Sequence, residues 1–213
     1  TEARGIADYV EALGLACVMT SDDCLSGSDR VLEAANKSDQ TYDILISLQG
    51  DAPFTPVTAI SGLLDIFEQA PDTKVATPVI RLGWNELDTL RNYKQTTPFS
   101  GTTAIVDAQG YARWFSKAII PAIRKEDALR ESQSQSPVFQ HLGVYAYRRD
   151  ILENFVTWPQ GYYEQLEGLE QLRFLENDVS IRTVEIATDA GIAQMGIDSP
   201  QDIDRAAQML SNR

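Results

Sequence analysis

The chain has 213 residues, of which 43% are hydrophobic and 23% charged, and its formal net charge is −13. This composition is typical of a globular protein with one large domain or two small ones. The acidity argues against a general nucleic-acid-binding protein, because contacts to phosphate backbones need clustered Lys and Arg. No apolar run approaches the roughly 18 residues of a membrane span, so we expect no membrane partner. Cys17 and Cys24 fit neither a disulfide framework nor a metal motif, and we expect free thiols in a cytoplasmic protein.

The N-terminal part of the sequence predicts a helix over residues 1–13 and a short strand over 15–19. A polar loop over 20–30 then leads into a helix that ends near Ala35. Its start, Ser26-Gly27-Ser28, offers small hydroxyls and free helix amides, which suit an anion or the polar edge of a heterocycle. An ordinary N-cap by Ser26 or Ser28 explains the same pattern, and these residues alone favour the cap.

The apolar run 44–48 predicts a strand that is buried on both faces, and Gln49-Gly50-Asp51 follows it. In open α/β sheets, ligands bind just beyond the carboxyl ends of such strands. A lone carboxylate in that place often holds Mg²⁺ on a nucleotide phosphate, which makes Asp51 a candidate metal ligand. A turn or helix-cap role explains Asp51 equally well.

Helix and strand continue to alternate up to residue 80, which indicates a parallel α/β sheet. The middle of the chain breaks this rhythm with two β-rich runs, 102–106 and 111–115. The turn sequence Asp107-Ala108-Gln109-Gly110 joins them and predicts a hairpin. The polar stretch 124–137 predicts a mobile loop.

The run 139–148 predicts a strand on which His141, Gly143, Tyr145 and Tyr147 share one face. His141 is the only histidine, and a structural role and a place in a polar pocket wall are both open. We expect helices over 149–155 and 162–176, and a strand over 179–187.

Two further candidate positions lie in the C-terminal part of the chain. Glu170 and Gln171 could point into a site from the helix predicted over 162–176, although a solvated acidic face also explains them. Asp198 is either the cap of the last helix or a second metal carboxylate opposite Asp51.

Taken in order, these stretches resemble the 3-deoxy-manno-octulosonate (Kdo) cytidylyltransferases, also called CMP-Kdo synthetases. Each matching segment is a weak signal, but seven in register, spanning nearly the whole chain, are specific. The segments are Ser26-Gly27-Ser28-Asp29-Arg30, Leu48-Gln49-Gly50-Asp51, 107–111, Phe115-Ser116-Lys117 with Ile120-Pro121, His141-Leu142-Gly143-Val144-Tyr145, Leu169-Glu170-Gln171-Leu172-Arg173 and Gly196-Ile197-Asp198-Ser199-Pro200.

The resemblance implies one nucleotidyltransferase domain over residues 1–213, built on a doubly wound, mostly parallel α/β sheet. It also implies a small antiparallel β insertion at about 98–148 that pairs subunits into a homodimer. The activity implied is the Mg²⁺-dependent synthesis of CMP-Kdo and pyrophosphate from CTP and Kdo, for lipopolysaccharide biosynthesis.

Residue roles follow from the same resemblance. Asp51 and Asp198 would be catalytic and hold Mg²⁺. Gln49 would lie near the junction of nucleotide and sugar. The resemblance places the cytidine pocket at Ser26, Gly27, Ser28 and Arg30. It places the Kdo hydroxyls and carboxylate against His141, Tyr145, Glu170 and Gln171.

The sequence departs from the family pattern in several places. Thr1 matches the end of the family's second strand, so we expect the first strand and a basic phosphate-binding loop to be missing from this sequence. Ala52 stands where the family usually has Glu, Thr103 where it has Lys, and Lys117 where it has Arg. These departures leave two alternatives open: a non-catalytic homologue that binds nucleotide or sugar, and a synthetase for a related acidic sugar.

Overall fold

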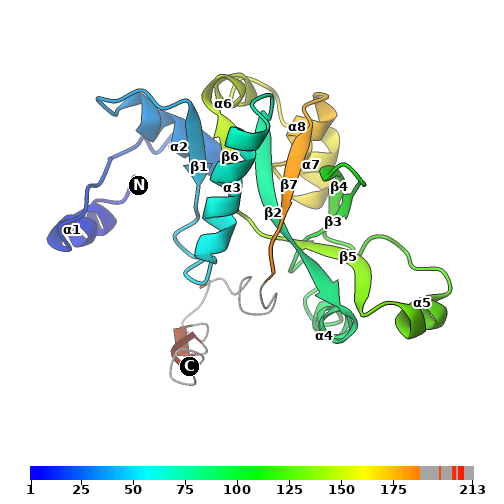
Figure 1. Cartoon of the computed structure of the whole chain (residues 1–213). Helices are drawn as coiled ribbons and strands as arrows, with labels where there is room; N and C mark the ends of the chain where they lie inside the picture. The colour runs from blue at the N-terminus through cyan, green and yellow to red at the C-terminus, as the bar shows by residue number, and fades with distance from the viewer. Residues whose placement is uncertain (188–196, 198–202, 205, 209–213) are drawn as a thin grey trace.

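A computed structural model describes residues 1–187, 197, 203–204 and 206–208 (Figure 1). Its helices are α1 (Arg4–Ala12), α2 (Gly27–Asn36), α3 (Val57–Gln69), α4 (Trp84–Lys94), α5 (Glu126–Ser132), α6 (Arg149–Phe155), α7 (Tyr162–Glu167) and α8 (Leu172–Glu176). Its strands are β1 (Ile44–Ser47), β2 (Val75–Gly83), β3 (Thr103–Val106), β4 (Tyr111–Ser116), β5 (Gln135–His141), β6 (Tyr145–Arg148) and β7 (Ile181–Glu185). Within the described residues, no helix combines the length and the apolar character that crossing a bilayer requires.

All seven strands belong to one sheet in the order β1-β6-β2-β5-β3-β4-β7, and β2 also pairs with β7. The strands β2, β5, β3, β4 and β7 therefore pair in a closed ring, from which β6 and β1 extend. The α/β class is confirmed, but the described strands do not confirm a mostly parallel sheet. Only β2 and β7 run parallel, because the β3–β4 hairpin and the returning β5 and β6 supply antiparallel neighbours.

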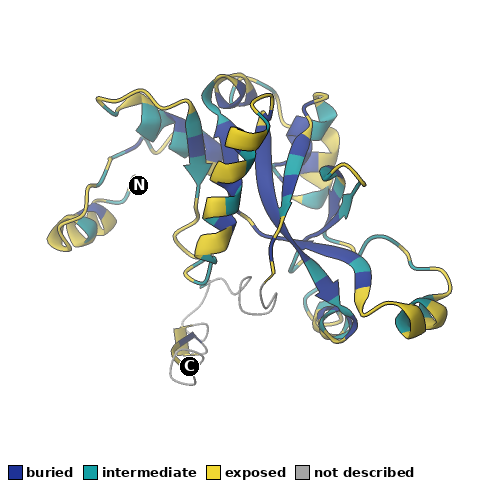
Figure 2. Ribbon diagram, viewed as in Figure 1, coloured by how far each residue is buried: buried dark blue, intermediate teal, exposed yellow. Residues whose placement is uncertain are grey.

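Strand β2 forms the centre of the core, and its side chains alternate between two apolar layers. Val75 and Val79 pack in a cluster with side chains of α2, α6 and α8. On the other side, Ala76 packs with α3 and Leu82 packs with α4. Helices therefore lie on both faces of the sheet, and the buried residues concentrate in the strands between them (Figure 2).

The N-terminal prediction is wrong for residues 15–19, which form no strand. Leu15 is 60% exposed, and the backbone around this segment bonds to Thr1: the Thr1 amine donates to the Val18 carbonyl, and Thr20 N–H donates to the Thr1 carbonyl. A β-rich run without a neighbouring strand cannot form a ladder. Helix α1 lies apart from the sheet, and Ile6 on its predicted apolar face is more than half exposed (Figure 1).

Two further predictions need correction. Strand β1 is not buried on both faces: only Leu45 of its four residues is buried, because β1 lies at one end of the strand order. The stretch 124–137, predicted as a mobile loop, contains α5 and the start of β5.

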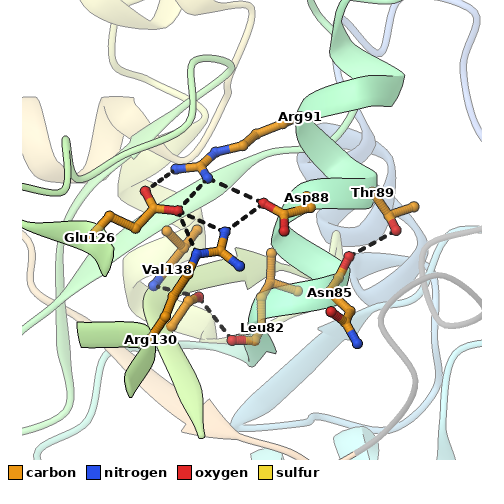
Figure 3. A network of polar contacts seen from close by, with 9 residues as sticks. Leu82, Asn85, Asp88, Thr89, Arg91, Glu126, Arg130 and Val138 are labelled. Atoms are coloured by element: carbon orange, nitrogen blue, oxygen red, sulfur yellow. Dashed lines mark hydrogen bonds and ion pairs between the residues drawn. The ribbon is translucent and has the colours of Figure 1, made fainter. Parts of the chain in front are cut away.

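An ion-pair network explains why this polar stretch is ordered (Figure 3). Arg91 of α4 donates to Glu126 Oε1 and Oε2 at 2.7 Å, and Arg130 of α5 donates to Asp88 Oδ1 at 2.6 Å. The Arg130 guanidinium also lies 4.6 Å from the centre of the Trp84 ring. These contacts fasten α5 to α4.

Candidate active site

A cavity of about 500 Å³ opens beyond the carboxyl end of β1. Five separate segments line it: the loop after β1, the residues before β3, the residue after β4, the β5–β6 connection and the α7–α8 connection. Six of the predicted site residues are in its wall, namely Gln49, Asp51, His141, Tyr145, Glu170 and Gln171. Residues that are far apart in the sequence thus meet at one place, beyond the end of the strand where the sequence leads us to expect a ligand.

The start of α2 adjoins this wall without lining it. Ser26 is the N-cap of α2, as the cap interpretation predicted, and its Oγ accepts the Asp29 N–H at 3.3 Å. The same Oγ lies 2.9 Å from Glu170 Oε1 in the cavity wall. Gly27 begins the helix, and the buried Ser28 hydroxyl lies 3.3 Å from the Tyr147 hydroxyl.

Arg30 has other partners in this structure. Its Nη1 donates to Thr20 Oγ1 at 2.7 Å and pairs with Glu2 Oε2 at 2.6 Å. The guanidinium therefore joins α2 to the N-terminal segment, and Arg30 is not among the described residues that line the cavity.

His141 is buried, at 6% exposure, and its Nε2 lies 2.9 Å from Thr77 Oγ1. The Thr77 hydroxyl has a single proton, and it also lies 2.8 Å from the Val144 carbonyl, which can only accept. This pattern assigns the Nε2–H tautomer to His141, with Thr77 accepting from it. Burial, reinforced by the charge of Lys117, lowers the pKa of His141 to about 3, so the ring is neutral at pH 7.

Thr77 was not predicted as a site residue, although it is the one hydroxyl within the otherwise apolar run 75–80. Its contacts to Val144 and His141 hold the irregular turn where β5 gives way to β6. That turn places both His141 and Tyr145 on the cavity wall.

The single strand predicted over 139–148 is wrong: β5 ends at His141 and β6 begins at Tyr145. The rings of His141, Tyr145 and Tyr147 nevertheless form a row. The centres of His141 and Tyr145 are 5.3 Å apart, and those of Tyr145 and Tyr147 are 5.8 Å apart. Burial raises the pKa of the Tyr145 hydroxyl well above its ordinary value, and nearby Tyr147 and Glu170 add to the shift. Tyr145 therefore presents a neutral hydroxyl that can both donate and accept.

The helix predicted over 162–176 is interrupted, and the interruption builds part of the site. Gly168, with φ +63°, caps the end of α7, and α8 begins only at Leu172. Glu170 and Gln171 therefore lie in a connection that faces the cavity instead of on a solvated helix face. Gln171 is 4% exposed, and its Nε2 has no hydrogen-bond partner in the described part of the chain. A buried donor without a partner is costly, so this amide is available to a ligand.

Lys117 is the cationic side chain in the described cavity wall. It is partly buried, and desolvation lowers its pKa, while the carboxylate of Glu167 acts in the opposite direction. Thr103, another departure from the family pattern, has a structural role here. Its hydroxyl donates to the Ala118 carbonyl at 2.8 Å and accepts the Ile120 N–H at 3.1 Å.

Asp51 is exposed and borders the cavity. The Ile197 N–H donates to the Asp51 carbonyl at 2.8 Å, which brings residue 197 beside it. Asp198 lies outside the described residues. Among those that are described, no group of three or more His, Cys, Asp or Glu side chains could hold a metal ion.

Comparison with known proteins identifies the family. The profile of the cytidylyltransferase family matches residues 1–181. The 3-deoxy-manno-octulosonate cytidylyltransferase of Maricaulis maris is 36% identical over 211 residues, which cover 99% of this chain and 79% of the relative. The protein of the same name from Parabacteroides distasonis is 34% identical, covering 100% of this chain and 81% of the relative.

Solved structures agree with these relatives. The structure of a CMP:2-keto-3-deoxy-manno-octonic acid synthetase complexed with CTP superimposes with a TM-score of 0.82 at 29% identity, covering 100% of this chain and 79% of that one. A 4-diphosphocytidyl-2C-methyl-D-erythritol synthase from Anaerococcus prevotii, at 12% identity and a TM-score of 0.56, shares the fold. The chain belongs to the cytidylyltransferase family and, within it, to the 3-deoxy-manno-octulosonate cytidylyltransferases, as the sequence resemblance predicted.

Proposed function

We propose that the protein makes CMP-Kdo and pyrophosphate from CTP and Kdo, a step that serves lipopolysaccharide biosynthesis. The observation that carries the proposal is the cavity itself. Beyond the end of β1 it brings together an exposed carboxylate, a cation, a neutral imidazole and a buried amide donor from distant segments. Its relatives are named for this activity, and a similar structure is described as a complex with CTP.

In the proposed reaction, the anomeric hydroxyl of Kdo attacks the α-phosphorus of CTP. A new O–P bond forms, the bond to the pyrophosphate oxygen breaks, and the hydroxyl proton leaves to solvent. Such transfers depend on in-line placement and charge stabilisation more than on covalent catalysis. The protein contributes placement through the rigid β5–β6 turn and the α7–α8 connection.

Asp51 and Asp198 are the residues that would hold Mg²⁺. The Asp51 carboxylate fits, because it borders the cavity and has no ion-pair partner in the described part of the chain. Mg²⁺ is usually bound through one or two carboxylates and completes its shell with water and phosphate oxygens. When bound, it neutralises phosphate charge and favours ionisation of the attacking hydroxyl.

The polar groups around the cavity suit an acidic sugar. Tyr145 offers its hydroxyls a neutral donor and acceptor, Glu170 offers them a carboxylate, and His141 contributes a neutral ring to the wall. The Gln171 amide and the Lys117 ammonium offer donors to its carboxylate. Gln49 would lie between sugar and nucleotide, and the amides at Ser26, Gly27 and Ser28 would receive the cytidine.

The test is pyrophosphate release that requires CTP, Kdo and Mg²⁺ together. We expect Asp51→Asn to reduce turnover at least about 100-fold, because a metal-binding charge is lost while the shape is kept. Asp65→Asn, on the exposed side of α3, is the matched control and should be unaffected.

Near-normal turnover by Asp51→Asn would refute the metal assignment. Stabilisation by CTP or Kdo without pyrophosphate release would identify a binding protein instead of an enzyme. A panel of other acidic sugars in the same assay would reveal a synthetase for a related substrate.

We also propose that two copies pair through the β-rich region at about 98–148, and that the enzyme works in the cytoplasm, where CTP is available. Sedimentation equilibrium tests the dimer: a single species of monomer mass would contradict it.

We propose a doubly wound architecture as well. Helices on both faces of the sheet and the parallel β2–β7 pair support it.

A further inference from the structure

Charged side chains hold both backbone polar groups of Lys117. Its N–H donates to Glu167 Oε2 at 2.7 Å, and its carbonyl accepts from Lys94 Nζ at 2.6 Å. Glu167 Oε1 also accepts from the Ser116 hydroxyl at 2.7 Å. The main chain just after β4 is thus fixed from the α7 side by a carboxylate and from the α4 side by an ammonium.

Lys94 is the last residue of α4, and its ammonium is fully engaged with the main chain. Nζ lies 2.5 Å from the Ser100 carbonyl, 2.8 Å from that of Gly101 and 2.6 Å from that of Lys117. The Pro98 carbonyl is a fourth neighbour at 3.3 Å. An ammonium has three protons, so these contacts use its donors. Lys94 is not among the residues that line the cavity, whereas Gly101 and Lys117 are.

A lysine side chain is a point charge on a flexible stem, so the position of its backbone decides where the charge can reach. Lys94 joins the segment 98–101 to residue 117, and Gly101 and Lys117 of these both line the cavity. Substituting Lys94 should therefore free the main chain at Lys117 to move, and the ammonium of Lys117 would move with it. Displacements of about 1 Å are enough to reduce binding and turnover.

We propose that Lys94 and Glu167 are positioning residues that fix the Lys117 ammonium in the cavity, where it binds an anionic oxygen of the substrates. This inference rests on the proposed function. The anion is either the carboxylate of the sugar acid or a phosphate of the nucleotide, and the test below separates the two.

The test is a double-mutant cycle with Lys94→Met, Lys117→Met and the double variant. We expect each single variant to raise the same KM about tenfold or more, and the double variant to be no worse than Lys117→Met. A rise in the KM for Kdo would identify the carboxylate, and a rise in the KM for CTP would identify the phosphate. Lys125→Met, an exposed lysine away from the cavity, is the control.

The inference is wrong if Lys94→Met lowers the melting temperature but leaves kcat and KM unchanged. It is also wrong if the effects of the two substitutions multiply in the double variant. Glu167→Gln keeps one oxygen for the Lys117 N–H and should retain more affinity than Glu167→Ala. Equal, wild-type affinity in both variants would overturn the role of Glu167.

A second measurement does not depend on turnover. Acetic anhydride acetylates lysine amines, and peptide mass spectrometry gives the rate at Lys117 relative to Lys125. We expect Lys94→Met and Glu167→Ala to raise this ratio severalfold, because the partly buried Lys117 is released. An unchanged ratio would refute the positioning role, whereas wild-type protein that binds and converts neither substrate would refute the proposed function alone.

Discussion

At the scale of single residues, His141 determines how stability depends on pH near neutrality. Its pKa is about 3 in the folded protein, against an ordinary value of about 6.5 in the unfolded chain. Between these values the unfolded state binds more protons, so the free energy of unfolding falls as the pH falls. The full stability contribution is present above pH 6.5 and is lost progressively towards pH 3.

We expect the free energy of unfolding to be about 2 kcal/mol lower at pH 5 than at pH 7, as measured by urea denaturation. His141 is the only histidine. Arg130 lowers the pKa of Asp88, and Arg91 lowers that of Glu126. These two carboxyl groups therefore lose their contribution to the free energy of unfolding mainly below pH 5. His141→Gln should therefore have nearly the same stability at both pH values, and a variant that keeps the wild-type slope would contradict this account.

The sequence predicts which residues lie at the cavity better than it predicts which side chains they contact. Alternation explains why Tyr145 and Tyr147 of β6 share a face, since that depends only on local geometry. It does not explain the place of His141, which lies in β5 before an irregular turn. The partners of Arg30 could not be predicted, because Glu2 and Thr20 approach it only through the path of the N-terminal segment. For the same reason, Thr77 becomes important only once β5 and β6 are paired beside it.

At the scale of elements, the site depends on the break between α7 and α8. Gly168 has a positive φ, and an added Cβ would meet nothing within 4 Å, so a substitution tests backbone strain alone. We expect Gly168→Ala to lower the free energy of unfolding by about 1–2 kcal/mol, the cost of a left-handed residue with a side chain.

Gly5→Ala is the matched control for this substitution. It also has open space around its Cβ, but it lies within α1 and has no positive φ. This change should be neutral or stabilising by about 0.5–1 kcal/mol. Equal effects of the two substitutions in chemical denaturation would show that Gly168 is not strained.

Local signals explain which elements the sequence predicts correctly. The turn sequence from Asp107 to Gly110 predicts the hairpin of β3 and β4, so this prediction needs no knowledge of tertiary contacts. The break at Gly168 could not be predicted, because glycine is tolerated inside an otherwise helical pattern. Tertiary contacts favour two short helices: Arg173 of α8 makes a buried, bidentate ion pair with Glu164 of α7, with Nε–Oε2 at 2.8 Å.

At the scale of the whole molecule, stability should be highest in β2 and lowest in α1. Strand β2 pairs with β5, β6 and β7, and most of its residues are fully buried. Helix α1 buries only Ala7. In hydrogen exchange followed by mass spectrometry, we expect amides of β2 to exchange only through global unfolding and those of α1 to exchange by local opening. Comparable rates in the two elements would contradict this order.

The sequence predicts the α/β class, because helices and strands alternate up to residue 80. It does not predict the ring of strands, which depends on pairing β2 with β7 and β4 with β7. Neither register is encoded in a short stretch of residues. The closed ring of strands depends on contacts between residues far apart in the sequence, which a local sequence pattern cannot predict.

The cavity wall is drawn from five segments between residues 49 and 171, and this has a consequence for the life of the protein in a cell. A wall assembled from segments so far apart exists only when the chain is folded, so substrates bind the native state alone. A ligand at 100 times its dissociation constant then adds about 2.7 kcal/mol to the free energy of unfolding. Unfolded molecules are the ones that proteases remove. We therefore expect a good supply of substrate to lengthen the lifetime of each enzyme molecule, as well as to raise its rate of turnover.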